Sequence, residues 1–199
     1  MSKKIPPHNL SHQIDFPMVL FDSLYGLILF FNLDSFLDIT DPLHFVLYVF
    51  SLIVVIHWWF EYKSADDCYG EEISRSTVNT IIGVILIILL EFFILKMKDG
   101  KFYAALSFLM LIFVADIVWA LIFRFLGRWK TKDKKLMTYM ENELERNMVV
   151  DLVALILLAG LFFAFPYIEI FWFVMSLLLI YIFYIYLTYK YKIIDVEIL

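Results

Sequence analysis

Residues 16–33 read FPMVLFDSLYGLILFFNL, and this stretch decides how the rest of the chain is interpreted. It is almost entirely apolar, but it contains one acid, Asp22. An α-helix of about this length crosses the hydrocarbon core of a bilayer, which is roughly 30 Å thick. An ionisable group in that core costs about 2.5 to 3.5 kcal/mol on insertion scales, so Asp22 should face other helices, water or a partner.

The composition extends the same interpretation to the whole chain. Of its 199 residues, 63% are hydrophobic and 19% are aromatic, which is typical of a polytopic membrane protein. Further apolar runs of spanning length follow the first, separated by short polar connections. We therefore expect an all-α fold, a single domain of six transmembrane helices after a polar lead-in over residues 1–15. The expected spans are residues 16–33, 43–60, 78–95, 102–125, 148–165 and 168–187.

The distribution of charge predicts the orientation of these spans. The connection after the first span contains Asp34, Asp38 and Asp41 but no base, whereas residues 128–135 form the most basic segment of the chain. Short loops rich in Lys and Arg stay on the cytosolic side. We therefore expect both termini in the cytosol and the acidic connection on the outer side.

Polar side chains inside the expected spans are the candidate functional residues. Some could form a path for protons or cations, because carboxyl groups within a helix bundle can exchange protons. Alternatively, they hydrogen-bond to one another and hold helices together. The candidates for this intramembrane network are Asp22, Ser23, His57, Trp59, Asn79, Glu91, Asp116 and Asp151.

A metal site is a weaker possibility. His57 and Glu61 are four residues apart and so share one face of a helix, and Asp151 could add a third ligand from another span. The aromatic residues around His57 are equally typical of a helix end anchored at the membrane interface. The chain contains no phosphate-binding loop, zinc-protease helix, nucleophile elbow or potassium-selectivity filter. We therefore expect no enzymatic activity, no cofactor and no nucleic-acid partner.

Residues 20–28, which read LFDSLYGLI, add a family resemblance. They resemble the FSDGVFAIA signature that opens each six-helix unit of the endolysosomal transmembrane potassium channels and of their prokaryotic homologues. Asp22 is shared and Tyr25 and Gly26 are similar in kind, whereas Phe21 stands where the family has serine. The resemblance implies that the first helices of several subunits line a pore. Its layers would be Leu27, Phe31 and, outermost, Asp34, while Asp22 would hold helices together.

Three hypotheses follow. The first is a potassium-type cation channel in a prokaryotic plasma membrane, a homo-oligomer with membrane lipids and monovalent cations as partners. The second is a proton- or metal-coupled transporter, for which the working residues would be His57, Glu61, Asp116 and Asp151. The third is a membrane module that transports nothing and binds lipid, a small ligand or a partner protein.

Overall fold

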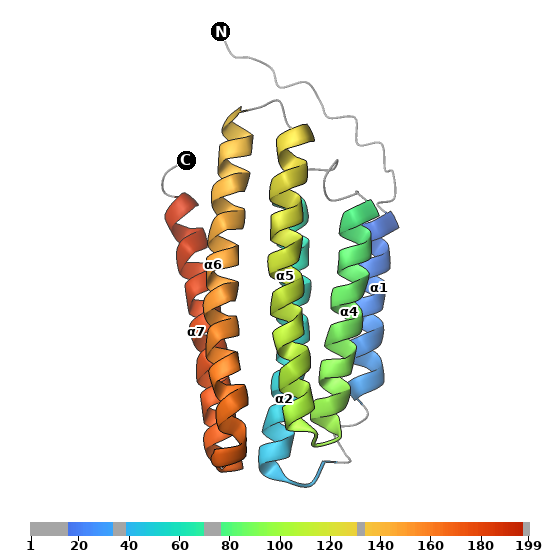
Figure 1. Cartoon of the computed structure of the whole chain (residues 1–199). Helices are drawn as coiled ribbons and strands as arrows, with labels where there is room; N and C mark the ends of the chain where they lie inside the picture. The colour runs from blue at the N-terminus through green and yellow to red at the C-terminus, as the bar shows by residue number, and fades with distance from the viewer. Residues whose placement is uncertain (1–15, 34–38, 70–76, 131–133, 197–199) are drawn as a thin grey trace.

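The computed structural model describes residues 16–33, 39–69, 77–130 and 134–196. These residues form six α-helices and one 3₁₀ turn, with no strand among them, so the predicted all-α fold is confirmed. The helices, shown in Figure 1, are α1 (Phe16–Leu33), α2 (Pro42–Tyr69), α4 (Thr77–Lys98), α5 (Phe102–Lys130), α6 (Lys134–Ala164), the 3₁₀ turn η2 (Phe165–Tyr167) and α7 (Ile170–Val196).

Five of these helices are long and apolar enough to cross a membrane. Their candidate spans are Pro42–Tyr62, Thr77–Lys98, Phe102–Phe125, Leu144–Tyr167 and Ile170–Lys190. The apolar part of α1, Val19–Leu33, is shorter. The chain is therefore a helical membrane protein, as the sequence predicts, with five full-length spans and one shorter apolar helix among the described residues.

Most predicted boundaries of the five full-length spans shift by one to four residues, and only the span at Phe102–Phe125 is unchanged. The sixth span was expected to begin at residue 168, but η2 occupies Phe165–Tyr167 and α7 begins at Ile170. Pro166 explains the shift, because proline cannot donate the backbone hydrogen bond of a continuing helix. The chain reverses over η2 and the residues that follow it.

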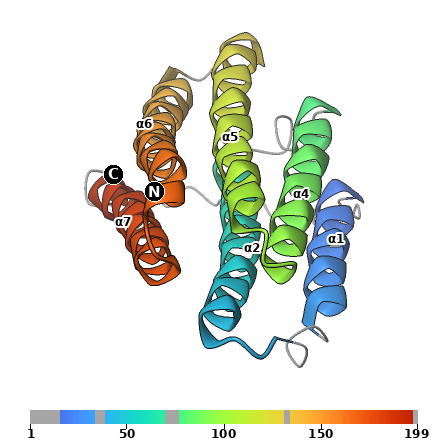
Figure 2. The same ribbon diagram turned by 60° about the horizontal axis from the view of Figure 1, so that its bottom comes forward.

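Successive helices run in opposite directions (Figure 1). We call the end of the bundle where α1 begins and α7 ends the upper end, and the opposite end the lower end. Figure 2 shows α1 at one edge and α6 with α7 at the other, with α2, α4 and α5 between them. α2 packs against α1, α4 and α7, so it connects the two sides of the bundle.

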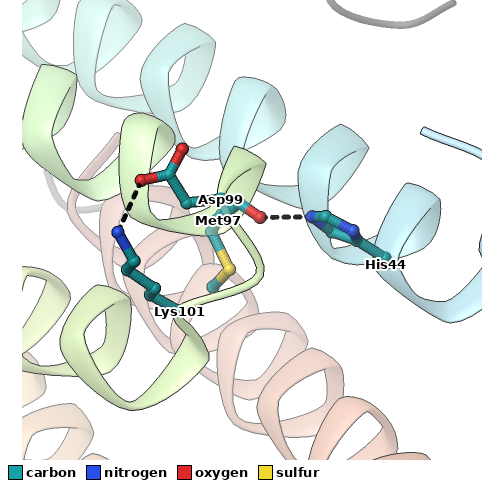
Figure 3. A network of polar contacts seen from close by, with 4 residues as sticks. All are labelled: His44, Met97, Asp99 and Lys101. Atoms are coloured by element: carbon teal, nitrogen blue, oxygen red, sulfur yellow. Dashed lines mark hydrogen bonds and ion pairs between the residues drawn. The ribbon is translucent and has the colours of Figure 1, made fainter. Parts of the chain in front are cut away.

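Polar contacts at the lower end join α2 to the end of α4, and Asp99 pairs with Lys101 in the turn that follows (Figure 3). Asp41 directly precedes α2 and caps it, because its Oδ1 accepts a hydrogen bond from the backbone N–H of His44 at 2.7 Å. The chain leaves α4 through Gly100, which has a positive φ of 70°. His44 then contacts the end of α4, with its Nε2 2.6 Å from the carbonyl oxygen of Met97. The Asp99-Gly100 turn therefore joins α4 to α5 and is braced by α2.

α1 is attached by close packing as well as by hydrogen bonds. The ring of Phe21 covers Gly83 of α4 so closely that a Cβ at Gly83 would lie 2.6 Å from Phe21 Cζ. Phe21 also packs on Tyr62 of α2, with ring centroids 4.5 Å apart. Near the lower end of α1, the hydroxyl of Tyr48 donates a hydrogen bond to the carbonyl oxygen of Asn32. α1 is thus fixed to both α2 and α4.

The outward faces of the helices are apolar. Large exposed side chains occur on the outer surface of every helix, for example Phe30, Phe125, Phe163 and Trp172. A water-soluble monomer rarely exposes so much continuous apolar surface. This surface is suited to contact with lipid chains.

Candidate functional site

Two carboxyl groups meet between α5 and α6. Asp116 and Asp151 hydrogen-bond to each other across the interface of the two helices. Asp151 is only 2% exposed. A hydrogen bond between two carboxyl groups requires a proton on one of them, because an ionised carboxylate can only accept. The contact therefore defines a place where the bundle can hold a proton.

α7 adds a hydroxyl group to this pair. The side chain of Tyr184 is buried and donates a hydrogen bond to Asp151. The second oxygen of Asp151, Oδ2, is buried and has no hydrogen-bond partner among the described residues. Buried polar atoms normally have a partner, so this oxygen is an exception within the described bundle.

α2 contributes a histidine that lies among tyrosines. The ring of His57 is 5.7 Å, centroid to centroid, from the rings of both Tyr181 and Tyr184. Tyr189 approaches the same ring to 6.4 Å. The hydroxyl of Tyr181 is buried and, in the described part of the chain, makes no hydrogen bond. His57 therefore sits against one face of α7, beside the tyrosine that contacts Asp151.

Glu61 lies one helical turn above His57 and acts on the whole group. Its charge interacts with Asp116, with Asp151 and with the tyrosines of α7. We call this set of residues the acid–tyrosine cluster. Its members are His57 and Glu61 of α2, Asp116 of α5, Asp151 of α6, and Tyr181 and Tyr184 of α7.

The cluster lies within the candidate spans and above their middle. From the lower start of α5 at Phe102 to Asp116 the helix rises about 20 Å at 1.5 Å per residue. Glu61, by contrast, is at the upper limit of the α2 span, which ends at Tyr62. The cluster thus runs from the upper membrane boundary to a point well inside the bundle.

The space directly below the cluster is apolar. A small pocket between α5, α6 and α7 borders Tyr181 and Tyr184. Its other lining residues are all hydrophobic: Leu109, Phe113, Ala154, Leu158, Leu177 and Ile180. The polar groups of the cluster therefore face an apolar layer on their lower side.

The other network candidates lie outside the cluster. Asp22 Oδ1 accepts a hydrogen bond from Trp59 Nε1 at 2.8 Å, which joins α1 to α2. Ser23 is exposed and bonds to the carbonyl oxygen of Val19 in its own helix. The structure therefore places Asp22, Ser23 and Trp59 in the attachment of α1.

Asn79 and Glu91 both belong to α4. Asn79 is buried and its Oδ1 accepts a hydrogen bond from Trp119 Nε1 of α5 at 2.9 Å. Glu91 Oε2 accepts one from Asn32 Nδ2 of α1 at 3.3 Å. Each contact connects α4 to a neighbouring helix.

The same construction recurs in the three successive helix pairs. In each pair the first helix carries an acid or amide and the second carries an aromatic donor. The acceptor and donor are Asp22 and Trp59, then Asn79 and Trp119, then Asp151 and Tyr184. All three first helices run downward and all three second helices run upward (Figure 1). The third acceptor also contacts a second acid, Asp116.

The pore candidates lie on the outer edge of the bundle. Leu27 is 47% and Phe31 is 68% exposed, on the side of α1 that faces away from α2 and α4. Asp34 lies outside the described residues. A pore lined by these residues would require more than one copy of the chain.

The metal candidates His57, Glu61 and Asp151 are part of the cluster. Within the described residues, however, no group of three or more His, Cys, Asp or Glu side chains could hold a metal ion. Two acids and a tyrosine in hydrogen-bonding contact are better suited to a proton than to a divalent cation, which prefers several converging ligands.

Tyr181 and Tyr184 were not among the functional residues expected from the sequence. Tyr181 and Tyr184 are three residues apart, so they share one helix face. That spacing could have indicated a polar face, but a tyrosine in an apolar run is also typical of an interface anchor.

A comparison with protein-family models, with curated proteins and with solved structures finds no match for this chain. The resemblance of residues 20–28 to the potassium-channel signature therefore stays a prediction. Function has to be argued from the geometry of the site.

Proposed function

We propose that the protein is a proton-coupled membrane transporter and that the Asp116–Asp151 pair carries the proton. The observation behind this proposal is the hydrogen bond between two carboxyl groups from different helices, within the candidate spans. Intramembrane carboxyl groups that face a bundle interior are the usual components of proton relays in transporters.

The pair can couple the proton to helix movement. While one carboxyl group is protonated, the hydrogen bond holds α5 and α6 together. When the proton leaves, two like charges face each other, and at about 4 Å such charges repel by about 4 kcal/mol at an effective dielectric constant near 20. Deprotonation would therefore favour separation of α5 from α6, which could open a path for a solute.

The topology adopted in this proposal has six crossings. α1 forms the sixth crossing together with the residues that flank its apolar part. Arg128 and Lys130 end α5, and Lys134 and Lys135 begin α6, both at the upper end, so we assign that end to the cytosol of a prokaryotic cell. Glu61 would then lie at the cytosolic boundary of the membrane.

The proposal is tested in liposomes that contain the purified protein and a pH-sensitive dye. Potassium and sodium gradients are imposed separately, and proton movement across the membrane is recorded. We expect a cation gradient to drive proton movement, and we expect Asp116→Asn to abolish it because an amide cannot release a proton. Ser107→Ala is the matched control on α5, since Ser107 bonds only to its own helix at the carbonyl oxygen of Tyr103. Proton movement that persists in Asp116→Asn would contradict the proposal.

A second candidate function is the oligomeric cation channel. It is favoured by the position of α1 at the edge of the bundle (Figure 2) and by the exposure of Leu27 and Phe31. Copies of the chain that associate through this edge would place both side chains between subunits.

The channel hypothesis makes a separate prediction. Leu27→Ala and Phe31→Ala should each raise potassium flux into liposomes, because smaller side chains widen an apolar constriction. The exposed Leu179 of α7, changed to Ala, serves as the control. Unchanged flux in both α1 variants would count against the channel. Proton and cation flux absent under every gradient would instead favour the binding module.

A further inference from the structure

The acid–tyrosine cluster contains several proton-exchanging groups close to one another. It begins at Glu61, near the upper boundary of the α2 span, and passes to His57 one turn below. The His57 ring lies against Tyr184, and the hydroxyl of Tyr184 donates to Asp151. Each step joins groups that can both accept and release a proton.

The surroundings of the pair differ between its two sides. Toward the upper end lies Glu61, near the limit of the α2 span, whereas the pocket below the pair is lined by apolar side chains of α5, α6 and α7. A proton is strongly disfavoured in an apolar layer without hydrogen-bonding groups. The apolar layer therefore disfavours the passage of a proton from the lower side.

We infer that Glu61, His57 and Tyr184 form the path by which protons reach the Asp116–Asp151 pair from the upper end of the bundle. This inference rests on the proposed function, because it assigns a route to the proton that the pair carries. Two buried polar atoms beside the path, Asp151 Oδ2 and the Tyr181 hydroxyl, support it, since neither has a hydrogen-bond partner within the described residues.

The transfer conserves protons at every step. Glu61 takes a proton from water and passes it to the imidazole of His57. His57 gives a proton to the phenol oxygen of Tyr184 as the hydroxyl proton of Tyr184 moves to Asp151. Glu61, His57 and Tyr184 then return to their starting states, and the pair has gained one proton.

Several titratable groups lie on the helices around His57. They are Glu61 on its own helix α2, Asp116 on α5, Asp151 on α6, and Tyr181, Tyr184 and Tyr189 on α7. Tyrosine rings can stabilise a cation held against their faces. His57 is therefore suited to accept a proton transiently.

The path is tested by hydrogen–deuterium exchange, which needs no knowledge of the transported solute. The protein in lipid bilayers is moved from H₂O to D₂O, and the infrared band of the protonated carboxyl group is followed as it shifts. Loss of a positioned acid–base group slows proton transfer by about 100-fold or more. We expect Glu61→Gln and His57→Phe each to slow the shift by at least about tenfold.

Two variants control this experiment. Glu61→Asp keeps a carboxyl group at the start of the path and should restore most of the rate, which a purely structural role for Glu61 would not predict. His44→Phe changes a histidine at the other end of α2, beside Met97, and should leave the rate unchanged.

The outcomes separate this inference from the proposed function. If the band is present in all variants and exchanges at the wild-type rate in Glu61→Gln and His57→Phe, the proposed proton path is wrong. The proposal that Asp116 and Asp151 carry a proton would still stand. A wild-type protein without the band would overturn the proton-carrying pair itself. Slow exchange in both variants, with rescue in Glu61→Asp, supports both.

Discussion

At the scale of single residues, Gly83 determines how closely α1 can approach α4. Because a Cβ at this position would lie 2.6 Å from Phe21 Cζ, Gly83→Ala must displace a ring that is fully buried. Overpacking of this kind costs about 1 to 3 kcal/mol. We expect a lower thermal unfolding temperature in detergent, measured by loss of helical circular dichroism. Gly26→Ala on α1 is the control, since nothing lies within 4 Å of its added Cβ, and an equal loss there would contradict this explanation.

The same scale shows the limit of prediction from sequence. Asp22 was singled out because it is an acid in an apolar run, and the structure places it against Trp59 of α2. Asp116 and Asp151 carry the same signal, yet only three-dimensional packing shows that these two meet. An isolated acid in a span reveals that a partner is needed, but the sequence does not identify the partner.

At the scale of helices, each pair is joined by an aromatic donor on its second helix. Trp119→Phe removes the Nε1–H group that donates a hydrogen bond to Asn79 Oδ1, while the amide of Asn79 stays buried. A buried polar group that loses its partner costs about 1 to 3 kcal/mol. We therefore expect α4 and α5 to separate more readily, measured as a lower unfolding temperature and as faster backbone hydrogen exchange in both helices.

Trp172→Phe is the matched control for this change, because Trp172 is 61% exposed on α7. It should alter stability by only a few tenths of a kcal/mol, as surface substitutions usually do. If both tryptophan variants are equally stable, the contact between Asn79 and Trp119 does not hold the helices together.

The helices themselves were largely predictable. Long apolar runs force the backbone to satisfy its own hydrogen bonds, so length and hydropathy identify spans well. The turn at Asp99-Gly100 was predictable for a related reason, because Gly100 adopts the left-handed backbone that ends a helix. The extent of α1 was harder to predict, since its apolar part is shorter than the other spans.

At the scale of the whole molecule, the bundle has two unlike sides joined by α2. On one side α1 is attached to α2 and α4 by Asp22, Asn32 and the ring of Phe21. On the other side α5, α6 and α7 meet α2 around the acid–tyrosine cluster. The sequence could not indicate this division, because polar residues occur in spans on both sides.

The central claim is that Asp116 and Asp151 together hold one proton inside the membrane. It is tested most directly by the infrared spectrum of the protein in lipid bilayers at neutral pH. We predict a band from a protonated carboxyl group that disappears in both Asp116→Asn and Asp151→Asn and persists in Glu91→Gln, whose acid lies between α4 and α1. A spectrum without this band in the wild-type protein, or one in which the band survives in both aspartate variants, would contradict the claim.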